Sequence, residues 1–163
     1  MRVTFLKSQA RVSHRLRTGV TRRVLFLAGA VSLLTLVGCA PTGPRFVGLA
    51  DVPPEGALIY YVRSPEVVGS GVRYRIFENG VPLYRTAPAR YFVHATTPGL
   101  KVIEASTETT TKLVLYVQKG ERYFVETELK TGGFIARPDL RQITESEALP
   151  LLREAYEAEP ETP

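Results

Sequence analysis

The hydrophobic pattern of residues 56–143 is that of short β-strands. Apolar and polar side chains alternate along residues 72–78, where Val72, Tyr74 and Ile76 share one face. The same period of two recurs in later runs. The expected strands are residues 57–63, 72–78, 81–85, 91–95, 100–105, 113–117, 122–129 and 134–136. Seven or eight strands separated by turns about ten residues apart predict an all-β fold, an antiparallel β-sandwich.

Turn residues mark the ends of several runs. Asn79-Gly80 predicts a two-residue hairpin, because both central residues of a type I′ turn need a positive φ. Pro82 cannot donate to a ladder, so we expect the return strand at a sheet edge. The threonine-rich residues 107–111 fit either a loop or an exposed strand.

The period changes after residue 143. Thr144 and Glu147 have the spacing of a capping box, and apolar residues then recur at helical intervals. These apolar residues are Ala148, Leu149, Leu152, Ala155 and Tyr156. Pro150 leaves the start of the helix open, because proline is tolerated only in a first turn. Residues 144–163 are therefore predicted to form one short helix with a frayed end from residue 159.

The N-terminal pattern is that of an export signal. Residues 24–37 form a run of fourteen almost uniformly apolar side chains after an arginine-rich stretch. The run is shorter than the roughly 20 residues of a transmembrane helix. Its basic start, short apolar centre and small-residue end are typical of a bacterial signal peptide.

Leu36-Val37-Gly38-Cys39 resembles the lipobox of bacterial lipoproteins, where an aliphatic residue, a tolerant position and a small residue precede an obligatory cysteine. The resemblance implies lipid, of palmitate type, on the Cys39 thiol and cleavage between Gly38 and Cys39. Ala40 stands where an Asp would favour inner-membrane retention, which indicates an outer-membrane lipoprotein facing the periplasm. An ordinary secretory signal and a lone transmembrane anchor are the alternative interpretations.

The export route stays open. Residues 21–26 (TRRVLF) resemble a twin-arginine motif, whereas adjacent arginines also occur in general-secretion signals. A translation start at Val20 rather than Met1 would leave a signal peptide of ordinary length.

The net charge of the chain changes sign when the predicted signal peptide is left out. The 163-residue chain, long enough for one domain, has 21 Lys+Arg, 16 Asp+Glu and a formal charge of +5. Seven of the basic residues and none of the acidic ones lie in residues 1–38, so 14 basic and 16 acidic residues, a charge of −2, remain from Cys39 onward. The net positive charge therefore comes from the targeting segment. It does not indicate a nucleic-acid-binding protein.

The domain organisation follows from these patterns. Residues 1–38 are the predicted signal peptide, and residues 39–55, rich in proline and glycine, the lipidated N-terminus and a tether. Residues 56–143 are the predicted sandwich, and residues 144–163 the helix and tail.

Catalytic and metal chemistry find little support in the sequence. One cysteine and two histidines exclude a disulfide framework and a cysteine-rich zinc site. His94 is the one histidine after residue 38 and has no evident partner, and Ser70 lies outside any nucleophile elbow. Glu126 and Glu128 point the same way on a strand, as Arg73 and Arg75 do on another; solvated or cross-strand paired faces explain both. We expect no catalytic residue, metal or cofactor.

A binding role remains as the function class. The first hypothesis is a lipid-anchored envelope protein with a non-enzymatic interaction or structural role. Lipid on Cys39 would hold it to the membrane. Its partner would be another envelope protein, of unknown identity. The alternative is a glycan- or ligand-binding module, for which Tyr84 and Tyr91 are the best candidates for exposed stacking platforms.

Residues 57–141 resemble the small lipoprotein domain of domain-of-unknown-function family 2846. The stretches that carry the resemblance are residues 57–63 (ALIYYVR), 68–71 (VGSG), 78–80 (ENG), 91–92 (YF), 97–99 (TPG) and 119–125 (KGERYFV). Relatives often carry histidine after Pro-Gly where this chain has Lys101. The family has no assigned activity, so the resemblance implies a fold and a lipoprotein class but no reaction.

Overall fold

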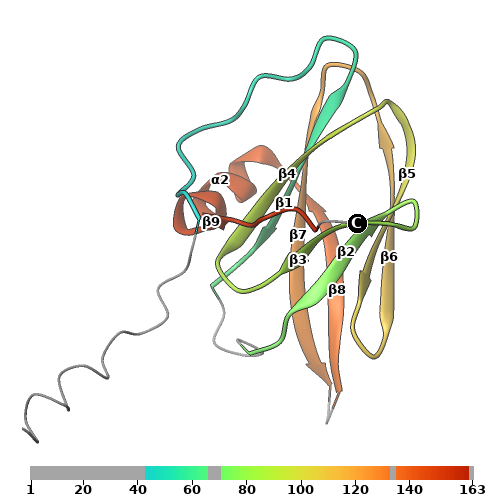
Figure 1. Ribbon diagram of the computed structural model, residues 1–163, viewed down its shortest axis with the longest axis vertical. Coiled ribbons are helices and arrows are strands. Elements are labelled where there is room, and N and C mark those ends of the chain that lie inside the picture. The colour runs from blue at the N-terminus through green and yellow to red at the C-terminus, as the bar shows by residue number, and fades with distance from the viewer. Residues whose placement is uncertain (1–42, 66–70, 133–134, 162–163) are drawn as a thin grey trace, which may run out of the picture. The chain divides into compact units, whose positions relative to one another are not determined.

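The computed structural model describes residues 43–65, 71–132 and 135–161, without the side chains of residues 131–136. Nine strands and one helix follow one another in this part of the chain. Two sheets share a core, which confirms the predicted all-β sandwich with a short C-terminal helix (Figure 1). Residues 41–163 form one compact unit.

The sandwich consists of a five-stranded first sheet and a four-stranded second sheet. The first has the order β8 (Ile135–Ile143), β7 (Arg122–Gly132), β1 (Ala57–Arg63), β4 (Arg90–Thr96) and β9 (Tyr156–Glu157). The second has the order β3 (Val81–Thr86), β2 (Tyr74–Glu78), β5 (Gly99–Ser106) and β6 (Thr110–Val117). Most neighbours are antiparallel, whereas β1–β7 and β4–β9 are parallel.

Strand β1 lies at the centre of the first sheet and is buried along its whole length. Ile59 and Tyr61 enter the core between the sheets, while Tyr60 and Val62 enter a second core on the other face. A nearly continuous apolar run is what a strand covered on both faces requires.

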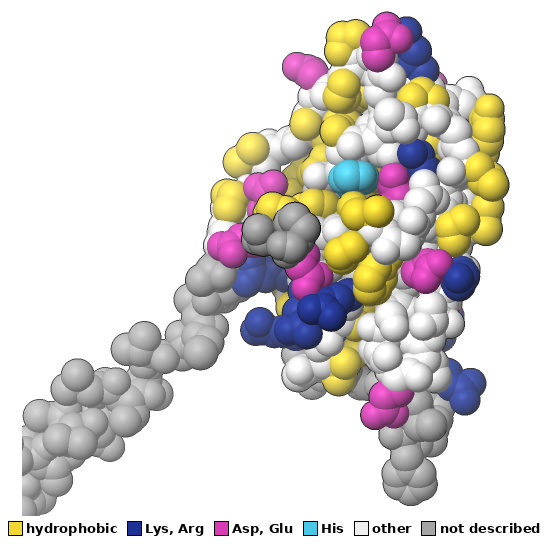
Figure 2. Space-filling view, turned by 45° about the vertical axis from the view of Figure 1, so that its right-hand side comes forward, with side chains coloured by type: hydrophobic (Ala, Val, Ile, Leu, Met, Phe, Trp, Pro, Cys, Tyr) yellow, Lys and Arg dark blue, Asp and Glu magenta, His cyan; other side chains and the backbone are white. Residues whose placement is uncertain are grey.

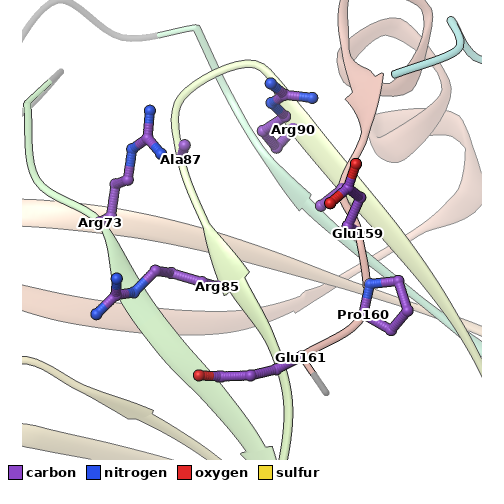
Figure 3. Close-up of a pocket in the computed structure, with 8 residues that line it drawn as sticks. Arg73, Arg85, Ala87, Arg90, Glu159, Pro160 and Glu161 are labelled. Carbon is purple, nitrogen blue, oxygen red and sulfur yellow. The ribbon is translucent and has the colours of Figure 1, made fainter. Parts of the chain in front are cut away.

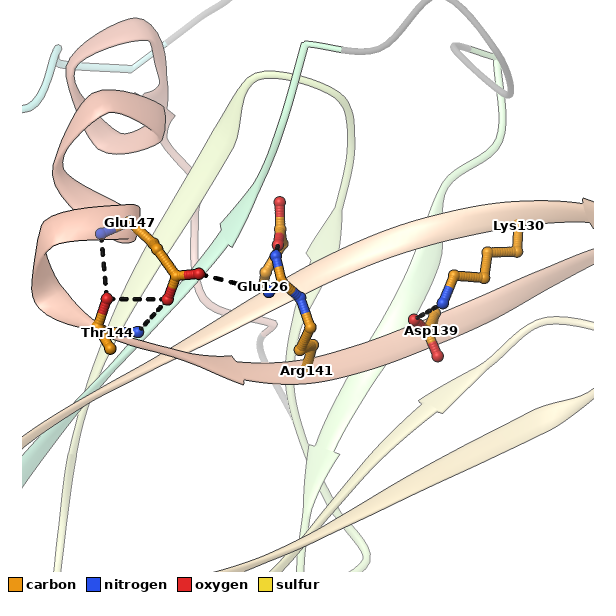
Figure 4. Close-up of polar contacts among 6 residues, drawn as sticks. All are labelled: Glu126, Lys130, Asp139, Arg141, Thr144 and Glu147. Carbon is orange, nitrogen blue, oxygen red and sulfur yellow. Dashed lines mark hydrogen bonds and ion pairs between the residues drawn. The ribbon is translucent and has the colours of Figure 1, made fainter.

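Helix α2 (Glu145–Glu154) covers the second of these cores. The predicted capping box is present: Glu147 N donates to Thr144 Oγ1 at 3.3 Å, and Thr144 N donates to Glu147 Oε2 at 2.8 Å (Figure 4). Leu152 is fully buried against the sheet. Burial of such a side chain contributes about 2 kcal/mol, which offsets part of the cost of about 3 kcal/mol for Pro150 inside the helix.

The β2–β3 hairpin forms as predicted. Asn79 and Gly80 have φ values of 51° and 80°, as a type I′ turn demands. Strand β3, which contains Pro82, is the edge of the second sheet. The Asn79 side chain also accepts a hydrogen bond from Val102 N at 2.9 Å, which fastens the turn to β5.

Two segments differ from expectation. Strand β8 extends to Ile143, although only residues 134–136 were expected to be extended. Pro138 hides this strand in the sequence, and the structure accommodates it because β8 is an edge strand.

The predicted tether is the second difference, because its residues 43–55 lie against the domain. They contain no strand or helix apart from a bridge at Arg45. Phe46, Leu49 and Val52 nevertheless pack on the core beneath α2, and Ala50 N donates to the Tyr60 hydroxyl at 2.7 Å. This part of residues 39–55 therefore covers the outer face of the first sheet.

Candidate functional site

A pocket of about 360 Å³ opens where the C-terminal tail, residues 156–161, passes from the first sheet to the second. Its walls come from the residue before β2, from β3, from the connection between β3 and β4, from the first residue of β4 and from the tail (Figure 3). The lining residues are Arg73, Arg85, Ala87, Arg90, Ala158, Glu159, Pro160 and Glu161. We call it the arginine pocket, because three guanidinium groups line it.

The tail is held by backbone hydrogen bonds to both sheets. Ala158 N donates to Tyr91 O on β4 at 2.7 Å, and Glu161 N donates to Leu83 O on β3 at 2.8 Å. The tail therefore bridges the edges of the sheets and forms one wall of the pocket.

The predicted frayed end is wrong for residues 159–161. Pro160 forms a bridge with Tyr84, and Glu161 is held to β3. The sequence gives no sign of this because the tail has no apolar period; the free edges of β3 and β4 hold its backbone. Residues 162–163 lie outside the described residues.

The arginines of β2 and β3 share one face. Arg75 lies directly opposite Arg85 in the ladder, next to the buried pair Tyr74 and Thr86, so both arginines point out of the sandwich. Like charges directly opposite each other are destabilising. The carboxylate of Glu161 relieves part of this repulsion, since its Oε1 lies 2.7 Å from Arg75 Nε.

Positive charge still exceeds negative charge at the pocket. The side chains of Arg73 and Arg85 form no hydrogen bond or ion pair among the described residues, and both are exposed. Arg90 donates to Glu157 O at 3.1 Å. Figure 2 shows one group of Lys and Arg side chains with acidic side chains beside it, and further basic side chains elsewhere on the face that it draws.

Gly43 lies at the Arg90 end of the pocket. Its φ of +106° disfavours other residues, and a Cβ there would clash with Glu157 O and lie 3.3 Å from Arg90 Nη1. Glu157 N in turn donates to Pro44 O at 2.8 Å. The described chain therefore begins beside the pocket.

The pocket has the chemistry of an oxyanion site. Guanidinium groups present planar forks of N–H donors that match carboxylate and phosphate oxygens. The lining set includes no histidine, cysteine, serine or threonine that would act as a nucleophile. The arrangement can bind and orient an anionic group.

His94 lies in a different, interior polar cluster. The buried Glu78 carboxylate accepts a hydrogen bond from Thr96 Oγ1 at 2.7 Å, and Lys101 Nζ lies 3.4 Å from the same oxygen. His94 Nε2 is 3.7 Å from that oxygen, too far for a hydrogen bond, and its side chain is partly exposed. The cluster links strands of both sheets. The Thr96 hydroxyl donates to the Glu78 carboxylate rather than to His94.

The cluster keeps Glu78 ionised. Burial alone would raise the pKa of Glu78, but the polar contact with His94, the Thr96 hydrogen bond and the charges of His94 and Lys101 outweigh it and hold this pKa below its ordinary value. Glu78 is thus a structural anion rather than a proton donor at neutral pH.

Of the two strand carboxylates Glu126 and Glu128, the first forms an ion pair with Arg141. Glu126 is buried, and its Oε2 accepts a hydrogen bond from Arg141 Nη2 across the β7–β8 ladder at 2.6 Å (Figure 4). Arg141 Nη1 also lies 3.6 Å from Glu147 Oε1, which connects the pair to the cap of α2. A cross-strand pairing was one of the two sequence-based interpretations, and it holds for Glu126.

Tyr84 and Tyr91 are not exposed stacking platforms, and that expectation is wrong. Tyr84 is fully buried and stacks on Phe92 with ring centroids 4.6 Å apart. Tyr91 is 6% exposed and packs edge-on against Phe46. Burial, with the nearby charge of Glu157, raises the pKa of Tyr91 to about 12. Tyr84 lies in the core between the sheets, and Tyr91 lies in the second core, on the outer face of the first sheet.

The other sequence-based site residues lie outside the described residues. They are Ser70 and the lipobox Leu36, Val37, Gly38 and Cys39. Within the described part, no group of three or more His, Cys, Asp or Glu side chains is arranged to hold a metal ion. No helix found there has the length and apolarity to cross a membrane.

Sequence reasoning missed the arginine pocket. Arg73 and Arg75 were singled out, but Arg85 and Arg90 lie on other strands and the acidic wall comes from the tail. The hairpin at Asn79-Gly80 alone would place Tyr84 opposite Arg75; a register shift between Ile76 and Phe77 brings Arg85 there instead, and nothing in the sequence indicates this shift.

Comparison of the chain with protein-family models, with curated proteins and with solved structures gave no match.

Proposed function

We propose that this protein is a lipid-anchored protein of the bacterial cell envelope with a non-enzymatic binding or structural role. The observation that carries the proposal is the lipobox Leu36-Val37-Gly38-Cys39 at the end of a short apolar run. The residue after the cysteine is Ala40 and not Asp, which supports the outer membrane, on its periplasmic side, as the proposed location. The resemblance to family 2846 belongs to the same proposal and adds no reaction.

The polar clusters support a non-enzymatic role. Of the two carboxylates singled out in the sequence, Glu126 is engaged in an ion pair with Arg141, and the buried Glu78, which was not singled out there, is paired with Lys101. The hydroxyl of Thr96 donates to Glu78 and is not activated by His94. A nucleophile needs a base within hydrogen-bond reach, and these contacts serve packing instead.

Ligand binding is the second candidate, and the arginine pocket favours it. A purely structural protein has no need of exposed guanidinium groups around a concave site, where mutual repulsion costs stability. A platform of exposed Tyr84 and Tyr91 is excluded, so the glycan variant of this candidate rests on other residues.

Processing of variants tests the lipid anchor. In a bacterial host, Cys39→Ala should leave a precursor longer than the wild-type chain, because cleavage requires the lipidated thiol. Val37→Ala is the matched control and should be processed normally, since that lipobox position is tolerant. Mass is the readout, because an uncleaved precursor stays on the membrane through its apolar run. Normal cleavage of the Cys39→Ala chain before residue 39 would contradict the proposal.

A further inference from the structure

Only a few residues of chain separate the arginine pocket from Cys39, the proposed site of the lipid anchor. Gly43 packs beside Arg90 and Glu157 at one end of the pocket. Four peptide steps separate Gly43 from Cys39, so their Cα atoms are at most about 14 Å apart. If Cys39 is lipidated, the pocket is held at the level of the headgroups of the same membrane.

We propose that the arginine pocket binds the phosphate of a phospholipid headgroup in the membrane that anchors the chain. The proposal rests on the lipid anchor for the location of the pocket and on the pocket's own side chains for its chemistry. Arg73 and Arg85 offer guanidinium forks that have no partner among the described residues, and Arg90 adds a third at the side nearest Gly43. Charge-assisted bonds from Arg to phosphate are among the strongest hydrogen bonds in proteins.

The acidic wall selects among headgroups. Glu161 is already paired with Arg75, whereas Glu159 is exposed and has no hydrogen bond or ion pair among the described residues (Figure 3). A carboxylate beside a phosphate site disfavours a purely anionic ligand and favours one that carries a primary amine. Phosphoethanolamine, a phosphate with a nearby ammonium, fits this mixed charge.

Size and overall charge agree with this assignment. A volume of about 360 Å³ is at the lower end for ligand sites, so it holds a headgroup rather than a protein segment. The chain from Cys39 onward has a formal charge of −2, so general attraction to anionic membranes is absent. Recognition has to come from the pocket.

Titration of the unlipidated mature chain tests the pocket without the anchor. Residues 39–163 with Cys39→Ser contain the whole compact unit 41–163. The probes are O-phosphoethanolamine, inorganic phosphate, and phosphatidylcholine vesicles with and without phosphatidylethanolamine or phosphatidylglycerol. The readouts are the NMR shifts of the Arg73, Arg85 and Arg90 side chains and co-sedimentation with vesicles.

The variant Arg73→Gln/Arg85→Gln should bind O-phosphoethanolamine at least about tenfold more weakly than the parent chain. The control Arg137→Gln/Arg153→Gln removes the same charge at exposed sites outside the pocket and should bind normally. Glu159→Gln should lower the preference for phosphoethanolamine over inorganic phosphate. If the glutamine pair impairs folding, Arg73→Lys/Arg85→Lys is the alternative variant. It keeps the charge but lacks the planar guanidinium donors, so its loss of affinity for O-phosphoethanolamine should be smaller.

The outcomes separate the possible sources of phosphate. Co-sedimentation that requires phosphatidylethanolamine and fails in the glutamine pair supports the proposal. Binding of inorganic phosphate as tightly as phosphoethanolamine, without vesicle binding, would assign the pocket to a soluble anion and overturn it. Equal binding by the pocket and control variants would overturn it as well. Because this chain carries no lipid, failure here is distinct from failure of the anchor, which the mass of the processed chain reports.

Discussion

Glu78 shows how single residues join the two sheets. It lies on β2 and is contacted by Thr96 of β4 and Lys101 of β5. Lys101 is itself 6% exposed and also donates to Thr97 Oγ1 at 3.1 Å. Two buried opposite charges stabilise each other only as long as both are present, because either one alone lacks water.

Replacement of Glu78 by Gln should therefore destabilise the domain at pH 7 by about 2–4 kcal/mol, because Lys101 loses its counter-charge. Urea unfolding measures the change. The double variant Glu78→Gln/Lys101→Met should recover part of the loss, and additive losses would contradict a direct pair.

The same residue predicts a pH dependence. The pKa of Glu78 is lower in the folded protein than in the unfolded chain, so its contribution is complete above the unfolded value of about 4.3 and disappears as the pH falls toward the folded value. Glu147, whose pKa is lowered by the backbone and side chain of Thr144, acts in the same direction. Stability should decline below about pH 4.5. The decline should be shallower in Glu78→Gln, and identical slopes would contradict the role of Glu78.

Local chemistry at single residues was predictable where neighbours in sequence decide it. The positive φ of Asn79 and the cap formed by Thr144 and Glu147 follow from adjacent residues alone. Tyr84 and Tyr91 were misassigned, because their burial depends on rings from other segments: Tyr61 and Phe92 pack against Tyr84, and Phe46 packs against Tyr91.

At the scale of elements, the C-terminal tail is a structural part of the sandwich. It adds β9 to β4 and reaches β3 through Glu161, so it covers the free edges of two strands. Unpaired strand edges tend to recruit other chains, and the tail removes this risk within one molecule.

The variant Ala158→Pro tests the tail, because proline removes the N–H that donates to Tyr91 O. A loss of about 1–3 kcal/mol in the free energy of unfolding is expected. Ala158→Ser keeps the N–H and should cost clearly less. Equal effects of the two substitutions would show that this hydrogen bond contributes nothing.

The cap of α2 gives a second prediction for an element. Thr144→Ala removes the side chain that accepts from Glu147 N and should lower stability by about 1 kcal/mol. Thr144→Ser is the control that keeps the cap. A lower urea midpoint with an unchanged slope would identify the effect as a loss of stability; an unchanged midpoint would contradict it.

Elements with a clear period were predicted well, and those without one were missed. Strand β1 has the bounds expected from its apolar run, Ala57–Arg63. Strand β8 and the tail carry prolines and charged residues, and they are extended because β7, β4 and β3 offer edges to pair with. The pocket depends on both kinds of element, which is why the sequence revealed only part of it.

At the scale of the molecule, the proposed membrane anchor lies at the N-terminus, at Cys39. The chain from Cys39 onward is slightly acidic, so its net charge provides no general attraction to anionic lipids. A diacylglycerol and an amide-linked acyl chain on Cys39 would supply more than the two chains that suffice for stable anchoring, at about 0.8 kcal/mol per buried methylene. The described chain would then begin, at Gly43, close to the bilayer, with the arginine pocket beside it.

The intact mass of the wild-type protein, isolated from the cell envelope of a bacterial host, tests the central claim most directly. We predict a chain that begins at Cys39 and carries a thioether-linked diacylglycerol and an N-terminal acyl group. A mass equal to that of an unmodified chain that begins at any other residue would contradict the lipoprotein assignment.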